Sequence, residues 1–264
     1  MIRLIITDMD GTLLHNDKSM PKDIFRLIEQ LQQRHIHFAA ASGRQYASLR
    51  ESFQQYASQM HFIAENGAVI ADGSDNSIIE THPLPPCDIG EMIRLARSLP
   101  DTEIVVCCPT VAYYESDSPI LQANIAPYYH ARKRVKDLTA IQEDIAKLAV
   151  LNIRGTAQYV YPHFSSFAKH LSIVVSSFEW MDIMMPNVHK GIGVKALQQR
   201  LHIRKDETMA FGDFMNDYQL LQEATYSYAM KNALPQIKQI ANYETKYTNE
   251  EDGVIQTIKE VLDL

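Results

Sequence analysis

Cysteine is scarce in this chain of 264 residues, which contains only Cys87, Cys107 and Cys108. An odd number of cysteines, two of them adjacent, does not suit the framework of paired disulfides that is typical of small secreted domains. We therefore expect a protein of a reducing compartment and predict a cytoplasmic location.

Long apolar runs are missing as well. No run reaches the ~18 residues that a membrane-spanning helix needs, and the apolar start Met1–Ile6 meets Asp8 too early for a signal peptide. Basic residues are in deficit, since 25 Lys and Arg are outnumbered by 32 Asp and Glu, which gives a net charge of -7. We therefore expect neither a membrane nor nucleic acid as a partner. An anionic substrate remains compatible with this charge, because a bound cation can reverse the local field.

Several common catalytic signatures are also absent. The ten histidines include no His-Glu-x-x-His pair, and the chain has no Walker loop and no Gly-x-Ser-x-Gly elbow. Residues 191–196 match a dinucleotide-binding fingerprint in form only, because no clear strand with a glycine turn precedes them.

Short apolar runs alternate with helical patterns at both ends of the chain. Ile24, Leu27, Ile28 and Leu31 repeat at helical spacing and predict a helix over about Pro21–Arg34. Further predicted elements are strands at Arg3–Thr7, His35–Ala41, Phe62–Ala64 and Thr208–Phe211, and helices at about Gln45–Ala57 and Gly191–Leu201. This alternation is typical of a parallel sheet covered on both faces. We predict an α/β fold with a doubly wound, Rossmann-like core.

The pattern changes in the middle of the chain. The turn cluster Asp72–Asn76 predicts a hairpin, and the prolines that follow at 83, 85 and 86 predict a linker. Beyond this linker we expect strands at Glu103–Cys108, Leu148–Ile153, Leu171–Ser176 and Trp180–Met184. The simplest architecture is a core made of residues 1–84 and 186–264, interrupted by an inserted α+β cap domain at residues 85–185.

The strongest chemical signal is Asp8-Met9-Asp10-Gly11-Thr12, directly after the first apolar strand. Two carboxylates two residues apart on extended backbone point to one face, where they can hold one ion. Gly11 lets the backbone turn sharply, and the Thr12 hydroxyl can donate to an oxyanion. The alternative is a turn that merely ends a strand, because Asp and Gly are common turn formers.

Two more motifs lie where a helix begins. Ser42-Gly43 follows the second strand, and a hydroxyl with a free backbone N–H at a helix start binds anions. A plain N-terminal cap is the alternative. Lys190 also opens a helix, and its ammonium could neutralise both a phosphate and Asp8. A solvated lysine is the alternative here.

The fourth motif, Gly212 to Asp217, follows the strand Thr208–Phe211. Asp213 is placed to bind a metal, with a helix cap as the alternative, and Asn216 and Asp217 could hold Lys190 or a metal-bound water. In doubly wound sheets ligands bind outside the carboxyl ends of the strands. Hard oxygen ligands with no Cys or His nearby favour Mg²⁺ over zinc.

Taken in order, the four motifs resemble those of the haloacid dehalogenase superfamily. The long insertion between the second and third motifs resembles the cap of its Cof-type phosphatases. Further matches are Glu65-Asn66-Gly67-Ala68 and the stretch Asn249-Glu250-Glu251-Asp252-Gly253-Val254. The resemblance covers essentially the whole core, whereas the insertion matches in position and length more than in residues. One departure is His189, where the family more often has a small hydroxyl residue, and this bears on the substrate pocket.

The resemblance implies a role for each motif residue. Asp8 would be the nucleophile and a magnesium ligand. Asp10 would be the general acid and then the general base, with its backbone carbonyl on the metal, and Asp213 would complete the protein ligands. The phosphate would be held by Ser42, Gly43, Lys190 and a backbone N–H of Met9, with Asn216, Thr12 and Asp217 in support.

These expectations together describe a magnesium-dependent phosphatase that hydrolyses a small phosphorylated metabolite through a phosphoryl group on Asp8. Sugar phosphates and nucleotide or cofactor phosphates all remain open as substrates, and so does the oligomeric state. Two alternatives share parts of the pattern. One is a phosphosugar mutase with the same Asp-x-Asp-Gly-Thr start, and the other is a signalling receiver that holds a phospho-aspartate without hydrolysing it.

Overall fold

The computed structural model describes all 264 residues. Its internal contacts divide the chain into two compact units. The first comprises Met1–Gly43, Leu49–Glu80 and His189–Leu264, and the second comprises Arg44–Ser48 and Thr81–Val188. The segment predicted as an inserted domain, residues 85–185, therefore lies within the second unit. No helix combines the length and apolar character that a membrane crossing requires.

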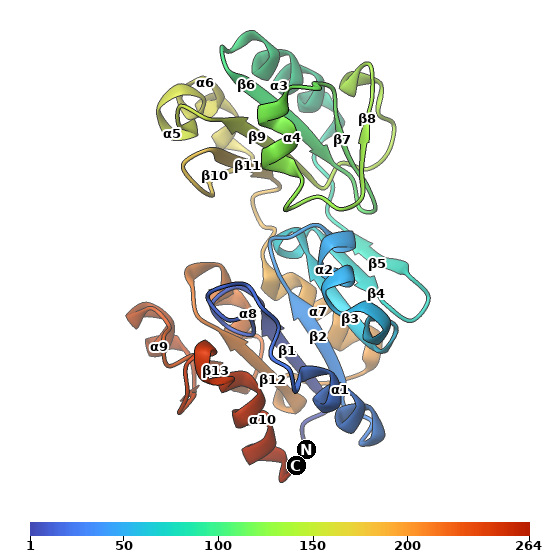
Figure 1. Ribbon diagram of the computed structural model, residues 1–264, viewed down its shortest axis with the longest axis vertical. Coiled ribbons are helices and arrows are strands. Elements are labelled where there is room, and N and C mark those ends of the chain that lie inside the picture. The colour runs from blue at the N-terminus through green and yellow to red at the C-terminus, as the bar shows by residue number, and fades with distance from the viewer. The chain divides into compact units, whose positions relative to one another are not determined.

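An eight-stranded sheet forms the centre of the first unit (Figure 1), in the order β14-β13-β12-β1-β2-β3-β4-β5. Its strands are β1 (Leu4–Asp8), β2 (His37–Ala41), β3 (Met60–Ala64), β4 (Val69–Asp72), β5 (Ser77–Thr81), β12 (Thr208–Gly212), β13 (Tyr226–Ala229) and β14 (Tyr243–Glu244). Neighbours from β14 to β3 are parallel, and β4 runs antiparallel to β3. The chain builds outward from β1 in one direction and from β12 in the other, so these two strands form the topological switch point. The predicted doubly wound α/β core is confirmed.

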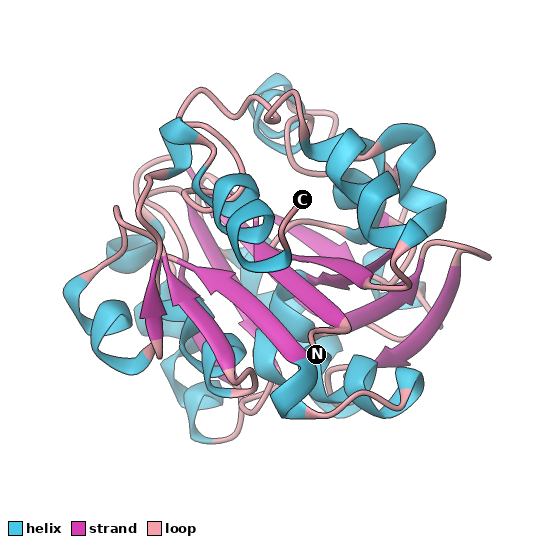
Figure 2. Ribbon diagram, turned by 90° about the horizontal axis from the view of Figure 1, so that it is seen from below, coloured by secondary structure: helices cyan, strands magenta, loops and turns pink.

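Helices lie on both faces of this sheet (Figure 2). They include α1 (Ile24–Gln33), α7 (Lys190–Leu201), α8 (Tyr218–Gln222), α9 (Pro235–Ile240) and α10 (Gly253–Leu262). Helix α2 (Tyr46–Ser52) is divided between the units, because Tyr46–Ser48 belong to the second and Leu49–Ser52 to the first. Short 3-10 turns occur at Gln54–Gln59, Glu65–Gly67, Lys205–Glu207, Met215–Asp217 and Asn249–Glu251. Helix α1 buries the four residues that the sequence spacing identifies, Ile24, Leu27, Ile28 and Leu31.

Several boundaries in the first unit differ from the prediction by a few residues, and at two places the cause is a residue with left-handed backbone. The strand predicted at His35–Ala41 begins at His37 in the structure, because His35, just after α1, has φ of 56°. The predicted helix Gln45–Ala57 ends at Ser52, and Gln54 has φ of 50°. Neither residue type signals this conformation as glycine does, so the sequence did not reveal the breaks.

The second unit contains a six-stranded sheet in the order β10-β11-β9-β6-β7-β8. Its elements are α3 (Pro86–Ser98), β6 (Thr102–Cys107), β7 (Ala112–Tyr114), α4 (Pro119–Ile125), β8 (Arg132–Arg134), β9 (Lys147–Asn152), α5 (Thr156–Tyr159), α6 (Tyr161–Phe164), β10 (Ser172–Val175) and β11 (Trp180–Met184), with 3-10 turns at Leu138–Ala140 and Ser165–Lys169. All neighbouring strands are antiparallel except β7 and β8, which are parallel. Both exceptional strands have only three residues, too few for a periodic signal in the sequence.

Alternate residues of the central strand β9 enter two separate apolar clusters of the second unit. Leu148 and Val150 join a large cluster that includes residues of α3 and α6, and Ala149 and Leu151 join a smaller one that includes residues of α4. This is the period-two pattern of a strand buried on both faces.

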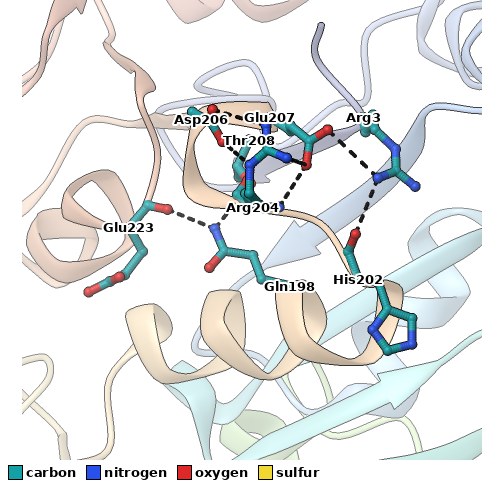
Figure 3. Close-up of polar contacts among 8 residues, drawn as sticks. All are labelled: Arg3, Gln198, His202, Arg204, Asp206, Glu207, Thr208 and Glu223. Carbon is teal, nitrogen blue, oxygen red and sulfur yellow. Dashed lines mark hydrogen bonds and ion pairs between the residues drawn. The ribbon is translucent and has the colours of Figure 1, made fainter.

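A polar network fixes the end of α7 to the beginnings of β1 and β12 (Figure 3). Arg3 Nη1 donates to the carbonyl oxygen of His202 at 3.2 Å and lies 3.7 Å from Glu207 Oε1. Gln198 Nε2 donates to Thr208 Oγ1 at 3.0 Å. Because α7 is anchored at this end of the sheet, its first residue is held at the opposite end, where the parallel strands finish.

Candidate active site

Asp8 is the last residue of β1, and it lies at the switch point between β1 and β12. Its side chain is buried. Asp10 lies two residues further on, is partly exposed, and forms an ion pair of 3.0 Å with Lys18. The two carboxylates of the first motif therefore occupy different environments, one in the interior and one near solvent.

Lys190, the first residue of α7, is completely buried. Its Nζ donates to Asp8 Oδ1 at 2.5 Å and to Asp217 Oδ1 at 2.6 Å. The alternative of a solvated lysine is therefore wrong. Charge-assisted bonds of this length are strong inside a protein, so Lys190 fixes the orientation of the Asp8 carboxylate.

Asp217 connects Lys190 to the loop that follows β12. Its second oxygen, Oδ2, accepts hydrogen bonds from the backbone N–H groups of Asp213 at 3.0 Å and Phe214 at 3.2 Å. Gly212 makes this turn possible, because a Cβ there would lie 2.5 Å from the Cβ of Asp217. Asp217 thus holds both the ammonium and the backbone of Asp213.

Asp213 is fixed against the first motif. The Thr12 hydroxyl donates to Asp213 Oδ1 at 2.8 Å. Gly11 has φ of +83°, and a Cβ on it would lie 2.5 Å from Asp213 Oδ2. Glycine is therefore required at position 11 both for the turn and for the close approach of this carboxylate.

The electrostatics of the cluster are unbalanced, since it contains three carboxylates and only one ammonium, which contacts Asp8 and Asp217. Burial, and next the neighbouring Asp217, raise the pKa of Asp8 to about 8. Burial likewise raises the pKa of Asp213 to about 6, although its bond from Thr12 acts in the opposite direction. Burial alone would favour a neutral Lys190, but Asp217 and Asp8 outweigh it and raise the pKa of the ammonium. The negative charge of the three carboxylates is therefore larger than the single ammonium can neutralise.

This donor set fits a hard divalent cation. One carboxylate oxygen from each of Asp8, Asp213 and Asp217 lies within 4.8 Å of the others. Both oxygens of Asp217 already accept hydrogen bonds, so Asp8 and Asp213 are the carboxylates better placed to bind a metal. Carboxylate oxygens are ligands that Mg²⁺ prefers, and a second cation would offset the excess negative charge.

Three more of the predicted residues, Ser42, Gly43 and Asn216, lie beside Asn66, a residue with no role in the predicted site. Ser42 follows β2, and its backbone oxygen accepts from the Asn66 N–H at 2.9 Å. A Cβ on Gly43 would lie 3.0 Å from Asn66 Nδ2, and Asn216 Nδ2 donates to Asn66 Oδ1 at 3.4 Å. Met9 is buried, and its carbonyl accepts from Leu14.

Gly67 brings the loop after β3 against the start of α7. It has φ of +103°, and a Cβ on it would lie 2.3 Å from the His189 carbonyl oxygen. The glycine is therefore needed for the close contact that fixes the residue before Lys190. The sequence contained a signal for it, since a glycine between two short apolar runs often marks a close backbone approach.

A comparison with protein families identifies the chain. A family model described as haloacid dehalogenase-like hydrolase matches residues 5–258. The chain belongs to this family. The resemblance expected from the four motifs is thus confirmed, and the family membership favours a hydrolase over the receiver alternative.

Relatives of this haloacid dehalogenase-like hydrolase include named phosphatases. The chain is 30% identical to the 5-amino-6-(5-phospho-D-ribitylamino)uracil phosphatase YbjI of Escherichia coli, over 99% of this chain and 96% of that protein. It is 26% identical to the HMP-PP phosphatase of Serratia proteamaculans, over 91% and 88% of the two chains. The crystal structure of TM0651 from Thermotoga maritima is 25% identical, covers 98% of this chain and 97% of that one, and superposes with a TM-score of 0.87. The predicted enzyme class, a phosphatase of this family, is confirmed.

Proposed function

We propose that this phosphatase is magnesium-dependent and that it hydrolyses a small phosphorylated metabolite through a phosphoryl group carried on Asp8. The observation that supports this most directly is the position of Asp8. Its buried carboxylate lies at the switch point of the sheet, is oriented by Lys190, and belongs to a cluster with too little positive charge.

Asp8 and Asp213 would hold the magnesium ion, together with the backbone carbonyl of Asp10. When bound, this cation would offset the negative charge of the phosphoryl group and of the carboxylates. It would also favour the ionised form of Asp8, whose pKa burial raises, and only the ionised carboxylate is a nucleophile.

The chain's own residues carry the two chemical steps. A carboxylate oxygen of Asp8 attacks phosphorus, and the bond from phosphorus to the leaving oxygen breaks while Asp10 gives that oxygen a proton. In the second step Asp10 takes a proton from water, whose oxygen attacks phosphorus and displaces the Asp8 carboxylate. Asp10 suits this role because its side chain is partly exposed, so the attacking water can reach it. The proton that Asp10 takes in the second step restores its acid form for the next turnover.

The transferring phosphoryl group would be held by Ser42, Gly43 and Lys190 and by the backbone N–H of Met9. Asn216 would support them through Asn66, to which its side-chain amide donates. Met9, Ser42 and Asn216 lie in loops that follow the parallel strands β1, β2 and β12, and Lys190 begins helix α7. Ligands bind at this end of the sheet in doubly wound folds.

The names of the relatives guide the choice of substrates. 5-Amino-6-(5-phospho-D-ribitylamino)uracil is the substrate in the name of the Escherichia coli relative, and the Serratia proteamaculans relative is named for HMP-PP. We propose that the substrate is a small soluble phosphomonoester. Sugar phosphates and nucleotide or cofactor phosphates are the classes to screen. We also propose a reducing compartment such as the cytoplasm, because none of the three cysteines forms a disulfide.

The test is phosphate release from a panel of such metabolites, by metal-free protein and after addition of MgCl₂. We expect release only with magnesium, and none by Asp8→Asn, which should keep the fold of the parent chain by circular dichroism. Full activity in the Asp8→Asn variant would refute the covalent route. Conversion of a sugar phosphate into an isomer without free phosphate would instead identify the mutase alternative.

A further inference from the structure

The loop that carries Asp10 is held by a segment more than 200 residues away in the sequence. Asn249 is buried, and its Nδ2 donates to the carbonyl oxygen of Leu14 at 3.0 Å and to Asn16 Oδ1 at 3.1 Å. The neighbouring loop contributes Asn232, whose Nδ2 donates to the carbonyl oxygen of Gly11 at 2.7 Å. Both asparagines therefore contact the segment that begins directly after Asp10.

The two asparagines are also bonded to each other. The backbone N–H of Asn249 donates to Asn232 Oδ1 at 3.1 Å. In addition, the backbone N–H of Leu234 donates to the Asp213 carbonyl at 3.0 Å, so the loop of Asn232 is fixed to the proposed metal loop. The pair thus links Asp213 to the segment after Asp10 through hydrogen bonds of ordinary length.

Further contacts strengthen the same attachment. Asp252 Oδ1 lies 2.7 Å from His15 Nε2, and Glu250 Oε1 accepts from the backbone N–H of Asn16 at 2.5 Å. The segment from Asn249 to Asp252 therefore meets three consecutive residues of the loop, 14–16, through both side-chain and backbone groups.

The backbone on both sides of Asp10 is held by hydrogen bonds to the carbonyl groups of its two neighbours. The Met9 carbonyl accepts from the Leu14 N–H at 2.8 Å, and the Gly11 carbonyl accepts from Asn232. The carboxylate of Asp10 itself contacts Lys18, but an exposed ion pair of this kind holds a side chain only weakly. The backbone around Asp10 thus sets the direction of its side chain more firmly than the ion pair does.

We propose that Asn232 and Asn249 are positioning residues, which hold the loop after Asp10 so that its carboxyl group meets the leaving oxygen of the substrate. The proposal rests on the role given to Asp10 under the proposed function. It also gives a role to the stretch Asn249–Val254, which matches the family but has no part in the catalytic steps described above.

The test compares two phosphate esters of similar size, p-nitrophenyl phosphate and phenyl phosphate. p-Nitrophenol leaves as an anion without help, whereas phenol leaves slowly unless it is protonated, so a misplaced acid harms the second substrate more. For both Asn249→Ala and Asn232→Ala, we expect kcat/KM on phenyl phosphate to fall about tenfold to 100-fold, and on p-nitrophenyl phosphate less than about threefold. The double variant should lose little more than the worse single variant, because both side chains act on one loop.

The matched control is Asn242→Ala. The side chain of Asn242 also donates to a backbone carbonyl, that of Thr225 at 2.9 Å, but it lies before β14, at the end of the sheet opposite the site. We expect no change in the ratio of the two kcat/KM values. Hydrogen–deuterium exchange provides a readout without catalysis: the peptide covering residues 11–19 should exchange faster in Asn249→Ala and Asn232→Ala, and at the parent rate in the control.

Equal losses on both substrates would overturn the positioning role, and so would unchanged exchange of residues 11–19. If Asn249→Ala does not fold, Asn232→Ala alone decides, because its side chain is exposed. Asp10→Asn separates this proposal from the function on which it rests. A selective loss in Asp10→Asn without one in the asparagine variants would reject the positioning role alone, whereas no selective loss in Asp10→Asn would reject the acid role of Asp10 and the positioning role with it.

Discussion

Lys190 determines how the charges of the site are balanced, because it is buried between two carboxylates. Lys190→Met would leave Asp8 and Asp217 without the ammonium that both of them contact. Breaking a buried ion pair from one side costs about 3–5 kcal/mol. We expect a loss of this size in the free energy of unfolding, measured with urea, together with loss of phosphatase activity.

Lys195→Met is the matched control on the same helix, since Lys195 is exposed and pairs with Glu223 at 3.1 Å. An exposed pair contributes about 0–1 kcal/mol. Similar small losses in both variants would contradict the assignment of Lys190 as the counter-ion of the buried cluster.

Single residues also show how far the sequence could lead. Asp8, Lys190 and Asp213 could be expected at one edge of the sheet, because Asp8 ends a strand, Asp213 directly follows one, and Lys190 begins a helix. The structure brings them together there. Asn232 could not be found in this way. A lone asparagine in a loop has many ordinary explanations, and its partner Gly11 is 221 positions away in the sequence. Hydrogen bonds between distant loops leave no local pattern.

At the scale of elements, the pairing of β2 and β3 contains a feature sensitive to acid. His37 Nδ1 and His61 Nε2 lie 3.1 Å apart, a hydrogen bond that needs at least one neutral imidazole. Burial lowers the pKa of both histidines, and Asp72, 3.7 Å from His61, only partly opposes this. Because the pKa of His61 is lower in the folded chain, the unfolded chain binds more protons in weak acid. The contribution of this histidine pair to stability is therefore fully present above about pH 6.5, the ordinary pKa of histidine, and it decreases as the pH falls below that value.

His61→Gln removes this titration, so we expect the loss of unfolding free energy between pH 7 and pH 5 to be smaller in the variant than in the parent chain. Urea titrations at several pH values measure it, and the exposed His163→Gln serves as the control. A parallel pH dependence in the parent and His61→Gln would show that the histidine pair does not cause the effect.

The elements also separate what the sequence can predict from what it cannot. Strands such as β1 and β12 are fully buried apolar runs and appear where the pattern predicts them. β7 and β8 have three residues each, and β8 consists entirely of exposed basic side chains. Their pairing depends on neighbouring strands rather than on their own sequence, so no period could reveal them.

At the scale of the whole molecule, each unit has an interior of its own. In the second unit, apolar side chains are buried on both sides of the six-stranded sheet, from Leu84 and Met92 to Trp180 and Ile183. A segment with its own core can fold alone. We propose that the predicted insertion at residues 85–185 is such a domain, and that the fragment 81–188 contains all of it.

We expect the isolated fragment 81–188 to unfold in one cooperative thermal transition, followed by circular dichroism. Its stability should be lower than in the intact chain, because the fragment lacks Arg44–Ser48, which the contacts group with this unit. Within that segment, the Gln45 side chain donates to the Ala131 carbonyl at 2.7 Å and accepts from the Ala131 N–H at 3.2 Å. Leaving both backbone groups without this partner costs about 1–3 kcal/mol where water cannot replace it. Gln45→Ala in the intact chain should therefore destabilise the second unit by a similar amount. A fragment with no cooperative transition would show that the insertion depends on the rest of the chain to fold.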